Sequence, residues 1–366
     1  MSDPLVVPER VLRSRTSAKW QQFEPDVLPL WVAEMDCDLA PGVAAAIHAV
    51  IDRGDTGYAA GETLQNAHRA FAAQTWGWEP EGAELVPNVM LGVVSLLRTL
   101  LRPGAPVFTA NPIYPPLVEY PRAAGFDVRQ LADGIEELDA QWQKLTGDFP
   151  RAAYLLCNPQ NPTGQVHSAA ELEALGEVAR RHGVVIIVDE IHAPLSYVPF
   201  TPVIPQIPEA FALQSASKAF NLVGLNVALL LRGPQAPPVR RAPELISAVS
   251  HVAEIAHSAA YGQTQWLADL LAALRVRREI VARFLARELP QVGFATPDAT
   301  YLAWLDFSAM TTASGEPVTA RRLVAEAKVA LSSGRPFGRP GFLRLNFATS
   351  EEILLEALER IAAAVR

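Results

Sequence analysis

The sequence predicts an α/β protein in which helices cover both faces of a mostly parallel central sheet. Short apolar runs at residues 106–109, 152–157 and 184–188 are typical of strands, and helical patterns separate them. Strands that alternate with helices form parallel sheets with helices on their faces. The run at 184–188, VVIIV, is β-branched throughout, which predicts a strand in the middle of that sheet.

The remaining elements follow from apolar spacing and from turn residues. The clearest helix is residues 168–182, where Ser168 and Glu171 form a capping-box pattern and Gly183 follows the last turn. Residues 1 to about 40 are expected to form an arm, in which the stretch LPLWVAEMDCDLAP is apolar but irregular. Further helices are expected at residues 41–53, 64–75, 89–101, 116–124, 136–145, 318–329, from 351 onward, and in a long stretch that ends near 287; further strands are expected at 85–86, 127–131, 210–213, 227–231, 301–307 and 342–347.

Length and element order predict several regions. The chain has 366 residues and half of them are apolar, which is ample for a large core and suggests two or three domains. We expect an N-terminal arm at residues 1–45, which contributes to a small domain. The arm is followed by a large domain at 46–260, a long connecting helix at 261–288 and a small C-terminal domain at 289–366.

The composition excludes several classes of protein. The net charge of −8 argues against nucleic acid, which needs a basic surface. No apolar run approaches the roughly 20 residues that span a bilayer, and the N-terminus lacks a signal-peptide pattern. The two cysteines, Cys37 and Cys157, lack metal-ligand spacing, so a reducing cytoplasm is expected. We find no zinc-type histidine cluster, nucleophile elbow, P-loop or dinucleotide-binding glycine motif.

Lys218 lies in the stretch QSASKAFNLVGL, directly after a predicted strand end. One interpretation is a lysine on an exposed turn. The other is a lysine held in a pocket, where desolvation favours the neutral, nucleophilic amine that forms a Schiff base with an aldehyde. In that case Ser215 and Ser217 could hydrogen-bond an anion beside it.

Two further strand ends carry polar residues. Asn161 lies in the turn CNPQNPTG, where it either only shapes the turn or directs its amide at a ligand oxygen. Asp189 closes VVIIV in the sequence DEIH, and a carboxylate there must cap a helix or pair with a cation. Pairing with a protonated ring nitrogen would contribute about 4 kcal/mol at roughly 4 Å and an effective dielectric near 20. His192 is placed to reach the same ligand, although a lone histidine is more often structural. Ligands of parallel sheets bind beyond the carboxyl ends of the strands.

A series of motifs carries a family resemblance. In chain order these are LPLWVAEMD, GYAAG, NPIYPPL, CNPQNPTG, VVIIVDEIH, SASKAFNLVGL, TYLAWLD and FGRPGFLRLNFA. Together they resemble the fold-type I pyridoxal-phosphate enzymes of the class I/II aminotransferase superfamily, and more closely its cystathionine β-lyase, or C–S lyase, branch. The resemblance covers nearly the whole chain. It implies a large cofactor-binding domain with a mostly parallel sheet and a smaller α+β domain.

The resemblance implies a role for each matching residue. Lys218 is similar to the Schiff-base lysine and Asp189 to the acid that pairs with the pyridinium nitrogen of pyridoxal 5'-phosphate. The other cofactor-binding positions are Asn161 at the phenolic oxygen, His192 near that oxygen, Tyr114 over the ring, and Ser215, Ser217 and the amides of Val89 and Met90 at the phosphate.

Three more residues match substrate and subunit contacts. Arg344 is similar to the arginine that binds the substrate α-carboxylate, a bidentate contact that lysine makes poorly. The alternative interpretation of Arg344 is that it forms an ion pair on the surface. Ala33, in LPLWVAEMD, is the other expected substrate-binding residue. Tyr58 is similar to the tyrosine that reaches the phosphate of the neighbouring subunit, which implies a homodimer.

Some positions depart from the family pattern. Many aminotransferases have a phosphate-binding arginine eight residues after the lysine; here that residue is Asn226. The lyase branch also lacks that arginine, although it usually has glutamine. Glu34 replaces a common aspartate, and Cys37 and Asp38 replace an aromatic-led segment. These changes lie close to the expected substrate pocket, so the substrate is left open.

The resemblance implies β-elimination from a small sulfur-containing amino acid, such as cystathionine. Lys218 would take the Cα proton and a thiolate would leave. An aminotransferase that uses the same lysine is the first alternative. A regulator that retains the fold is the second.

Overall fold

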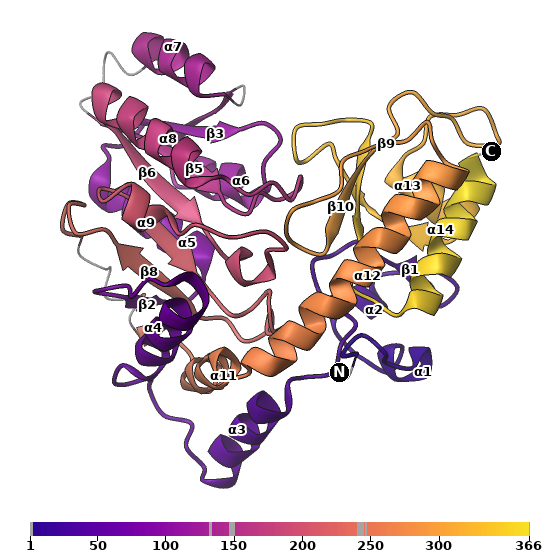
Figure 1. Cartoon of the computed structure of the whole chain (residues 1–366), viewed down its shortest axis with the longest axis horizontal. Helices are drawn as coiled ribbons and strands as arrows, with labels where there is room; N and C mark the ends of the chain where they lie inside the picture. The colour runs from indigo at the N-terminus through magenta and orange to yellow at the C-terminus, as the bar shows by residue number, and fades with distance from the viewer. Residues whose placement is uncertain (1–2, 132–133, 146–150, 240–244, 246, 366) are drawn as a thin grey trace. The chain divides into compact units, whose positions relative to one another are not determined.

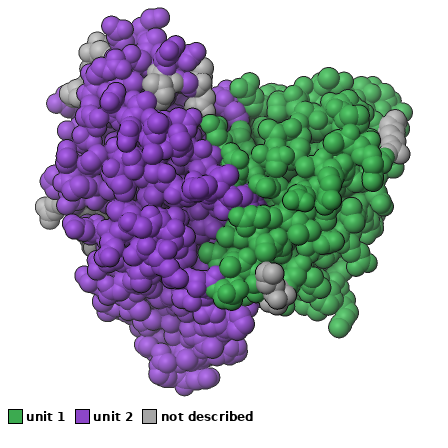
Figure 2. All heavy atoms as spheres, in the orientation of Figure 1, with its two compact units in different colours: residues 1–38, 161–165, 265–366 green, residues 39–160, 166–264 purple. Residues whose placement is uncertain are grey.

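The computed structural model describes residues 3–131, 134–145, 151–239, 245 and 247–365. The chain forms two compact units, which Figure 2 colours separately. Unit 1 comprises residues 1–38, 161–165 and 265–366, and unit 2 comprises residues 39–160 and 166–264. Compactness does not show that a segment folds alone, so the boundaries expected from the sequence remain predictions.

Unit 2 is built on a seven-stranded sheet. The strands are β2 (Glu84–Val86), β3 (Pro106–Ala110), β4 (Asp127–Leu131), β5 (Ala152–Cys157), β6 (Val184–Asp189), β7 (Phe211–Gln214) and β8 (Ala228–Arg232), in the order β2-β8-β7-β6-β5-β3-β4. Strand β8 pairs antiparallel with both neighbours, and every other pair in this sheet is parallel. The VVIIV run lies in β6, between β5 and β7, which confirms the predicted central strand of a mostly parallel sheet.

Helices pack on both faces of this sheet. The helices of unit 2 are α3 (Pro41–Asp52), α4 (Thr63–Trp76), α5 (Val89–Leu100), α6 (Pro116–Ala123), α7 (Ile135–Leu145), α8 (Ala169–His182), α9 (Val203–Gln206), the short η1 (Ala193–Leu195) and α11 (His251–Tyr261). Helices α3 and α4 pack against α11. Figure 1 shows α8 lying over β5 and β6. The capping box predicted for α8 is present: Ser168 Oγ accepts from Glu171 N–H, and Gly183 ends the helix in the left-handed conformation.

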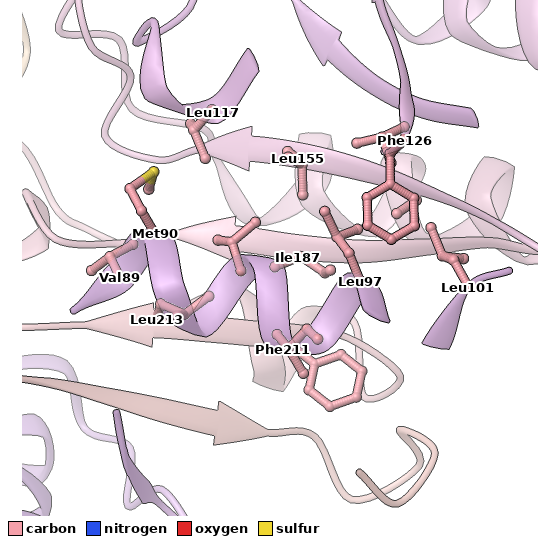
Figure 3. Close-up of a cluster of buried hydrophobic side chains, with 14 of the residues drawn as sticks. Val89, Met90, Leu97, Leu101, Leu117, Phe126, Leu155, Ile187, Phe211 and Leu213 are labelled. Carbon is pink, nitrogen blue, oxygen red and sulfur yellow. The ribbon is translucent and has the colours of Figure 1, made fainter. Parts of the chain in front are cut away.

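Side-chain alternation assigns each helix to a face. Leu155, Ile187 and Leu213 belong to one buried cluster with residues of α5 and α6, and Figure 3 shows them beside α5. Successive strand residues point to opposite faces. On the other face, Trp142 of α7 lies 6.2 Å from the ring of Phe108 and 5.4 Å from that of Tyr154. Asp189 lies two residues after Ile187, so it shares the face that α5 covers.

Unit 1 joins the N-terminal and C-terminal parts of the chain. Its described elements are α1 (Glu9–Leu12), α2 (Ala18–Gln21), β1 (Leu28–Pro29), α12 (Thr264–Glu288), β9 (Gly293–Phe294), β10 (Leu302–Asp306), α13 (Ala320–Arg322), the π-helical turn η2 (Leu323–Ala327), β11 (Val329–Ala330), β12 (Ser332–Ser333), β13 (Phe342–Asn346) and α14 (Glu351–Val365). Only the first residue of α12, Thr264, belongs to unit 2. The antiparallel sheet has the order β12-β13-β10-β9, and β1 pairs parallel with β11.

The helix expected at 318–329 is present but shorter. It consists of α13 and the π-helical turn η2, after which Val329 enters β11. Lys328 takes the left-handed conformation (φ 57°), which ends the helical turn, and Val329 pairs with Leu28. The N-terminal arm contains the short helices α1 and α2, which come before the stretch LPLWVAEMDCDLAP. Of the helices in the described part of the chain, none combines the length and apolar character needed to cross a bilayer.

Candidate active site

The carboxyl edge of the unit 2 sheet gathers most of the predicted site residues. Strand β2 runs parallel to β6 and β7, because both β2 and β7 are antiparallel to β8. The loops after β3, β6 and β7 and the start of α5 therefore lie at the same edge. Tyr114, His192 and Lys218 follow β3, β6 and β7, and Val89 begins α5 soon after β2. These predicted site residues of unit 2 therefore lie at the carboxyl edge of the sheet, where ligands of parallel sheets bind.

Asp189 is a buried carboxylate at this edge. Its side chain is 3% exposed, and Oδ1 accepts a hydrogen bond from Ile191 N–H at 3.0 Å. Burial raises the pKa of Asp189 to about 6, while the Ile191 N–H and the positive charge of Lys218 oppose this rise. A buried acid with such a pKa is stabilised in its charged form by any further cation beside it. Asp189 therefore suits a protonated ring nitrogen.

Lys218 lies within electrostatic reach of Asp189. It is half-buried in the turn that follows β7, between the half-buried Ser217 and the buried Ala219. Its charge lowers the pKa of Asp189, and the two residues lie at the carboxyl ends of the paired strands β6 and β7. The exposed-turn alternative for Lys218 does not match this burial.

The first turn of α5 is a ready anion site. Asn88 caps the helix, and its side chain accepts from Leu91 N–H at 2.9 Å. The N–H groups of Val89 and Met90 have no partner within the helix because they belong to its first turn. Such N–H groups, with the helix dipole, favour a phosphate.

Ser215 is held by its own turn. Its hydroxyl donates to Val227 O at 2.8 Å and accepts from Ser217 N–H at 3.2 Å. Nδ1 of the buried His257 lies 3.5 Å from the same hydroxyl, while His257 Nε2 donates to Leu225 O. Binding of a phosphate by Ser215 requires its hydroxyl to rotate away from Val227.

The other residues of unit 2 have different surroundings. Tyr114 is half-buried against the main apolar cluster. His192 is 1% exposed and precedes η1, whose Leu195 N–H donates to His192 O. Tyr58 is 85% exposed and forms an isolated antiparallel bridge with Ser250. Asn226 is exposed.

In unit 1 the structure brings Asn161 and Arg344 together. Arg344 is 5% exposed, which excludes the surface ion pair, and its Nη1 donates to Asn161 Oδ1 at 2.9 Å. Its Nη2 donates to Trp31 O at 3.4 Å and Ser332 Oγ at 3.5 Å, and the guanidinium lies 4.9 Å from the ring centre of Phe337. These hydrogen-bond acceptors are neutral, so they orient the guanidinium without cancelling its charge.

Ala33 belongs to the same unit. It is buried, and its carbonyl oxygen accepts a hydrogen bond from the Tyr301 hydroxyl at 3.0 Å. The carbonyl of the nearby Trp31 accepts from Arg344, so the segment that carries Ala33 also contacts the arginine.

Sequence reasoning missed a buried polar chain behind Asp189. Glu190 Oε1 accepts from Val203 N–H at 2.8 Å and Oε2 accepts from Gln214 Nε2 at 2.6 Å. Gln214 Oε1 contacts His68 Nε2. Burial raises the pKa of Glu190 to about 7 and lowers that of His68 to about 4. The signal in the sequence was the second carboxylate of DEIH, which closes a buried strand.

The described residues of unit 2 fit the chemistry of pyridoxal phosphate. The α5 N-terminus suits a phosphate, Asp189 suits a ring cation, and Lys218 supplies an amine near Asp189. The main departure is Ser215, whose hydroxyl is engaged with its own turn.

Comparisons with known proteins identify the family of the chain. The family model "Aminotransferase class I and II" matches residues 29–361. A Mycobacterium leprae protein provisionally named cystathionine beta-lyase is 42% identical, covering 97% of this chain and 96% of its own length. The Corynebacterium glutamicum cystathionine beta-lyase is 34% identical, covering 96% and 97%.

A solved structure extends the similarity to three dimensions. A Corynebacterium diphtheriae protein, provisionally described as a PLP-dependent beta-cystathionase, matches with a TM-score of 0.91 and 30% identity, covering 98% of both chains. The fold-type I architecture implied by the motifs is confirmed. The chain belongs to the class I and II aminotransferase family.

Proposed function

We propose that this chain is a pyridoxal-phosphate-dependent carbon–sulfur lyase. It converts cystathionine, or a related cysteine thioether, to a thiol, pyruvate and ammonia by β-elimination. The observation that carries this proposal is the buried Asp189 at the sheet edge with Lys218 in electrostatic reach. The names of relatives at 34% and 42% identity support the choice of reaction.

The cofactor contacts follow from the donor and acceptor groups on the chain. Pyridoxal phosphate, when bound, supplies the electron sink for a carbanion at Cα. Asp189 would accept a hydrogen bond from the ring nitrogen and stabilise its positive charge. The amides of Val89 and Met90, with Ser215 and Ser217, would bind the phosphate, and Tyr114 would cover the ring.

Asn161 has a defined orientation for the phenolic oxygen. Its Oδ1 accepts from Arg344, so its Nδ2 is the group that would be left to donate to the cofactor. His192 supplies a second group near the same oxygen. Arg344 and Ala33 bind the α-carboxylate of the substrate.

Lys218 acts twice in the proposed reaction. Its amine would hold the cofactor covalently, because a lysine amine forms a Schiff base with an aldehyde. In its free form the same amine would take the Cα proton as general base. The Cβ–S bond breaks and sulfur leaves with the electron pair. A thiol has a pKa of about 8.5, so a thiolate leaves readily. Hydrolysis of the released enamine gives pyruvate and ammonia.

We also propose a cytoplasmic homodimer. Tyr58 is 85% exposed, and the nearby Ile51 is 58% exposed, which suits residues that a second copy covers. Tyr58 would reach the phosphate of the partner subunit. Cys37 and Cys157 are buried free thiols, which suits a reducing compartment.

Turnover of cystathionine tests the reaction. Purified holoenzyme is incubated with cystathionine, and pyruvate, thiol and ammonia are measured with and without a keto-acid acceptor. The lyase releases the three products in equal amounts, and the acceptor does not change the rate. Turnover that requires the acceptor and releases no thiol would replace the lyase with an aminotransferase. If neither reaction occurs with cystathionine, cystine, cysteine conjugates or ordinary α-amino acids, a regulator that retains the fold becomes the better description.

A further inference from the structure

Unit 1 contains a fully buried ion pair that the proposed reaction does not use. Lys19 Nζ lies 2.8 Å from Asp36 Oδ2, and the two side chains are 0% and 2% exposed. Trp20 Nε1 donates to Asp36 Oδ1 at 2.8 Å, and Lys19 Nζ also donates to Glu34 O at 3.0 Å. Burying two charges costs more hydration than an apolar pair would, so overall stability alone does not account for this pair.

The ion pair anchors residues 31–36, which we name the 31–36 segment. Lys19 contacts this segment through the side chain of Asp36 and the carbonyl of Glu34. Trp31 Nε1 donates to Lys19 O at 3.3 Å at the other end. Lys19 therefore contacts both ends of the segment, through its side chain at one end and its carbonyl at the other.

The 31–36 segment contacts the β10 and β13 region through its backbone carbonyls. Asn346 Nδ2 donates to Val32 O and Glu34 O, both at 2.7 Å. The Tyr301 hydroxyl donates to Ala33 O. These bonds use successive carbonyls, so a shift of the segment changes all of them together.

The same segment contacts the proposed carboxylate-binding arginine. Trp31 O accepts from Arg344 Nη2 at 3.4 Å and from Ser332 Oγ. Ser332 Oγ in turn lies 3.5 Å from Arg344 Nη2. One edge of the guanidinium is therefore placed by the position of the Trp31 carbonyl. A bidentate grip on a carboxylate requires that placement to be accurate.

We propose that Lys19 and Asp36 are positioning residues for recognition of the substrate carboxylate, a role that rests on the proposed function of Arg344. The buried pair holds the 31–36 segment, and the segment orients Arg344. Glu34 lies in this segment and its Oε1 accepts from Ser17 Oγ at 2.5 Å. Glu34 and Cys37, which depart from the family pattern, therefore lie in or directly after the segment that orients Arg344.

The test compares ligands that differ only in a carboxylate. L-methionine and 3-(methylthio)propylamine are titrated into holoenzyme, and the absorbance of the bound cofactor reports each dissociation constant. The dissociation constant of the amine divided by that of L-methionine measures the contribution of the carboxylate to binding. We call this quotient the ratio. The variant is Lys19→Met with Asp36→Asn, which removes both charges and keeps an acceptor for Trp20. The matched control is Lys328→Met with Asp26→Asn, an exposed pair of the same residue types in the same unit, 3.3 Å apart.

The double variant is expected to lower the ratio at least tenfold while the amine binds as in the wild type. The control pair leaves the ratio unchanged. A ratio within twofold of the wild type, or an equal loss for both ligands, overturns the positioning role. If the double variant does not fold, Lys19→Arg retains the charge but not the shape. It is expected to lower the ratio at least threefold, and an unchanged ratio overturns the proposal.

Arg344→Met separates this proposal from the function on which it rests. A lower ratio in Arg344→Met, together with an unchanged ratio in the Lys19 variants, rejects only the positioning role of Lys19 and Asp36. An unchanged ratio in Arg344→Met rejects Arg344 as the carboxylate-binding residue.

Discussion

Arg344 Nη1 donates a 2.9 Å hydrogen bond to Asn161 Oδ1, and both side chains are buried. The two residues are far apart in the sequence, yet they belong to one compact unit. The bond fixes which end of the Asn161 amide is available as a donor. It also couples the group proposed for the cofactor oxygen to the group proposed for the substrate carboxylate.

Asn161→Asp is therefore expected to weaken substrate binding. A carboxylate at this position forms an ion pair with Arg344 and cancels the charge that the substrate needs. It also replaces the amide donor at the cofactor oxygen. The KM for cystathionine is expected to rise at least about tenfold, which corresponds to roughly 1.4 kcal/mol. Steady-state kinetics measure the change. Asn161→Ala, which removes the amide but adds no charge, is the control; an equal KM in the two variants would contradict the ion-pair explanation.

Glu190 is expected to make stability depend on pH. Its pKa is raised from 4.5 to about 7 by burial, so the folded state binds an extra proton between these values. The contribution of this protonation to the free energy of unfolding is fully present below pH 4.5 and is lost as pH rises through about 7. Glu190→Gln removes this dependence, which amounts to at most about 3 kcal/mol. Denaturant unfolding between pH 4.5 and 8 measures it.

The comparison needs a control for net charge. Glu173→Gln, on the exposed side of α8, removes the same charge without removing a buried carboxylate. The curve for Glu173→Gln is expected to run parallel to that of the wild type. Parallel curves for Glu190→Gln and the wild type would show that Glu190 does not titrate in this range.

Gly92 allows α5 to lie close to the sheet. A Cβ at this position would lie 3.2 Å from Val86 Cγ2 and closer still to Leu213 Cδ2. Gly92→Ala is expected to destabilise the protein by about 1–3 kcal/mol through overpacking. Urea denaturation measures the loss. Gly262→Ala is the control, because its Cβ would meet Ala259 O at an ordinary 3.4 Å. Combining Gly92→Ala with Leu213→Val should recover part of the stability; no recovery would argue against this contact.

The proposed dimer predicts complementation between subunits. Lys218→Ala and Tyr58→Ala are each expected to have little activity as homodimers. In a mixed dimer, one site combines the intact Lys218 of one subunit with the intact Tyr58 of the other. Equal amounts of the two variants, mixed and reassembled at random, should therefore restore about a quarter of the wild-type activity, because half of the dimers are mixed and each has one intact site of two. Activity that stays at the sum of the separate variants would contradict a shared site, as would a monomer by light scattering.

Local signals in the sequence predicted much of unit 2. VVIIV lies in the centre of the sheet because only a strand flanked on both sides and both faces tolerates such a run. The capping box of Ser168 and Glu171 is a short-range hydrogen-bond pattern, so the sequence alone reveals it. Asp189 and Lys218 follow strand ends, and parallel strands bring their ends to one edge.

Long-range pairings could not be predicted in this way. Val329 joins a strand because Leu28, some 300 residues earlier, pairs with it. Lys19 is buried because Asp36 and the carbonyl of Glu34 accept its hydrogen bonds. Nothing in the local pattern around Lys19 signals burial of a charge. The bond between Gln214 and His68 has the same character, since it joins two distant segments.

The covalent attachment of the cofactor to Lys218 is the most direct test of the central claim. Purified holoenzyme is reduced with borohydride, digested, and mapped by mass spectrometry. The account predicts a phosphopyridoxyl adduct on the peptide that contains Lys218, together with loss of the visible absorbance. An adduct on another lysine, or protein that takes up no pyridoxal phosphate, would contradict it.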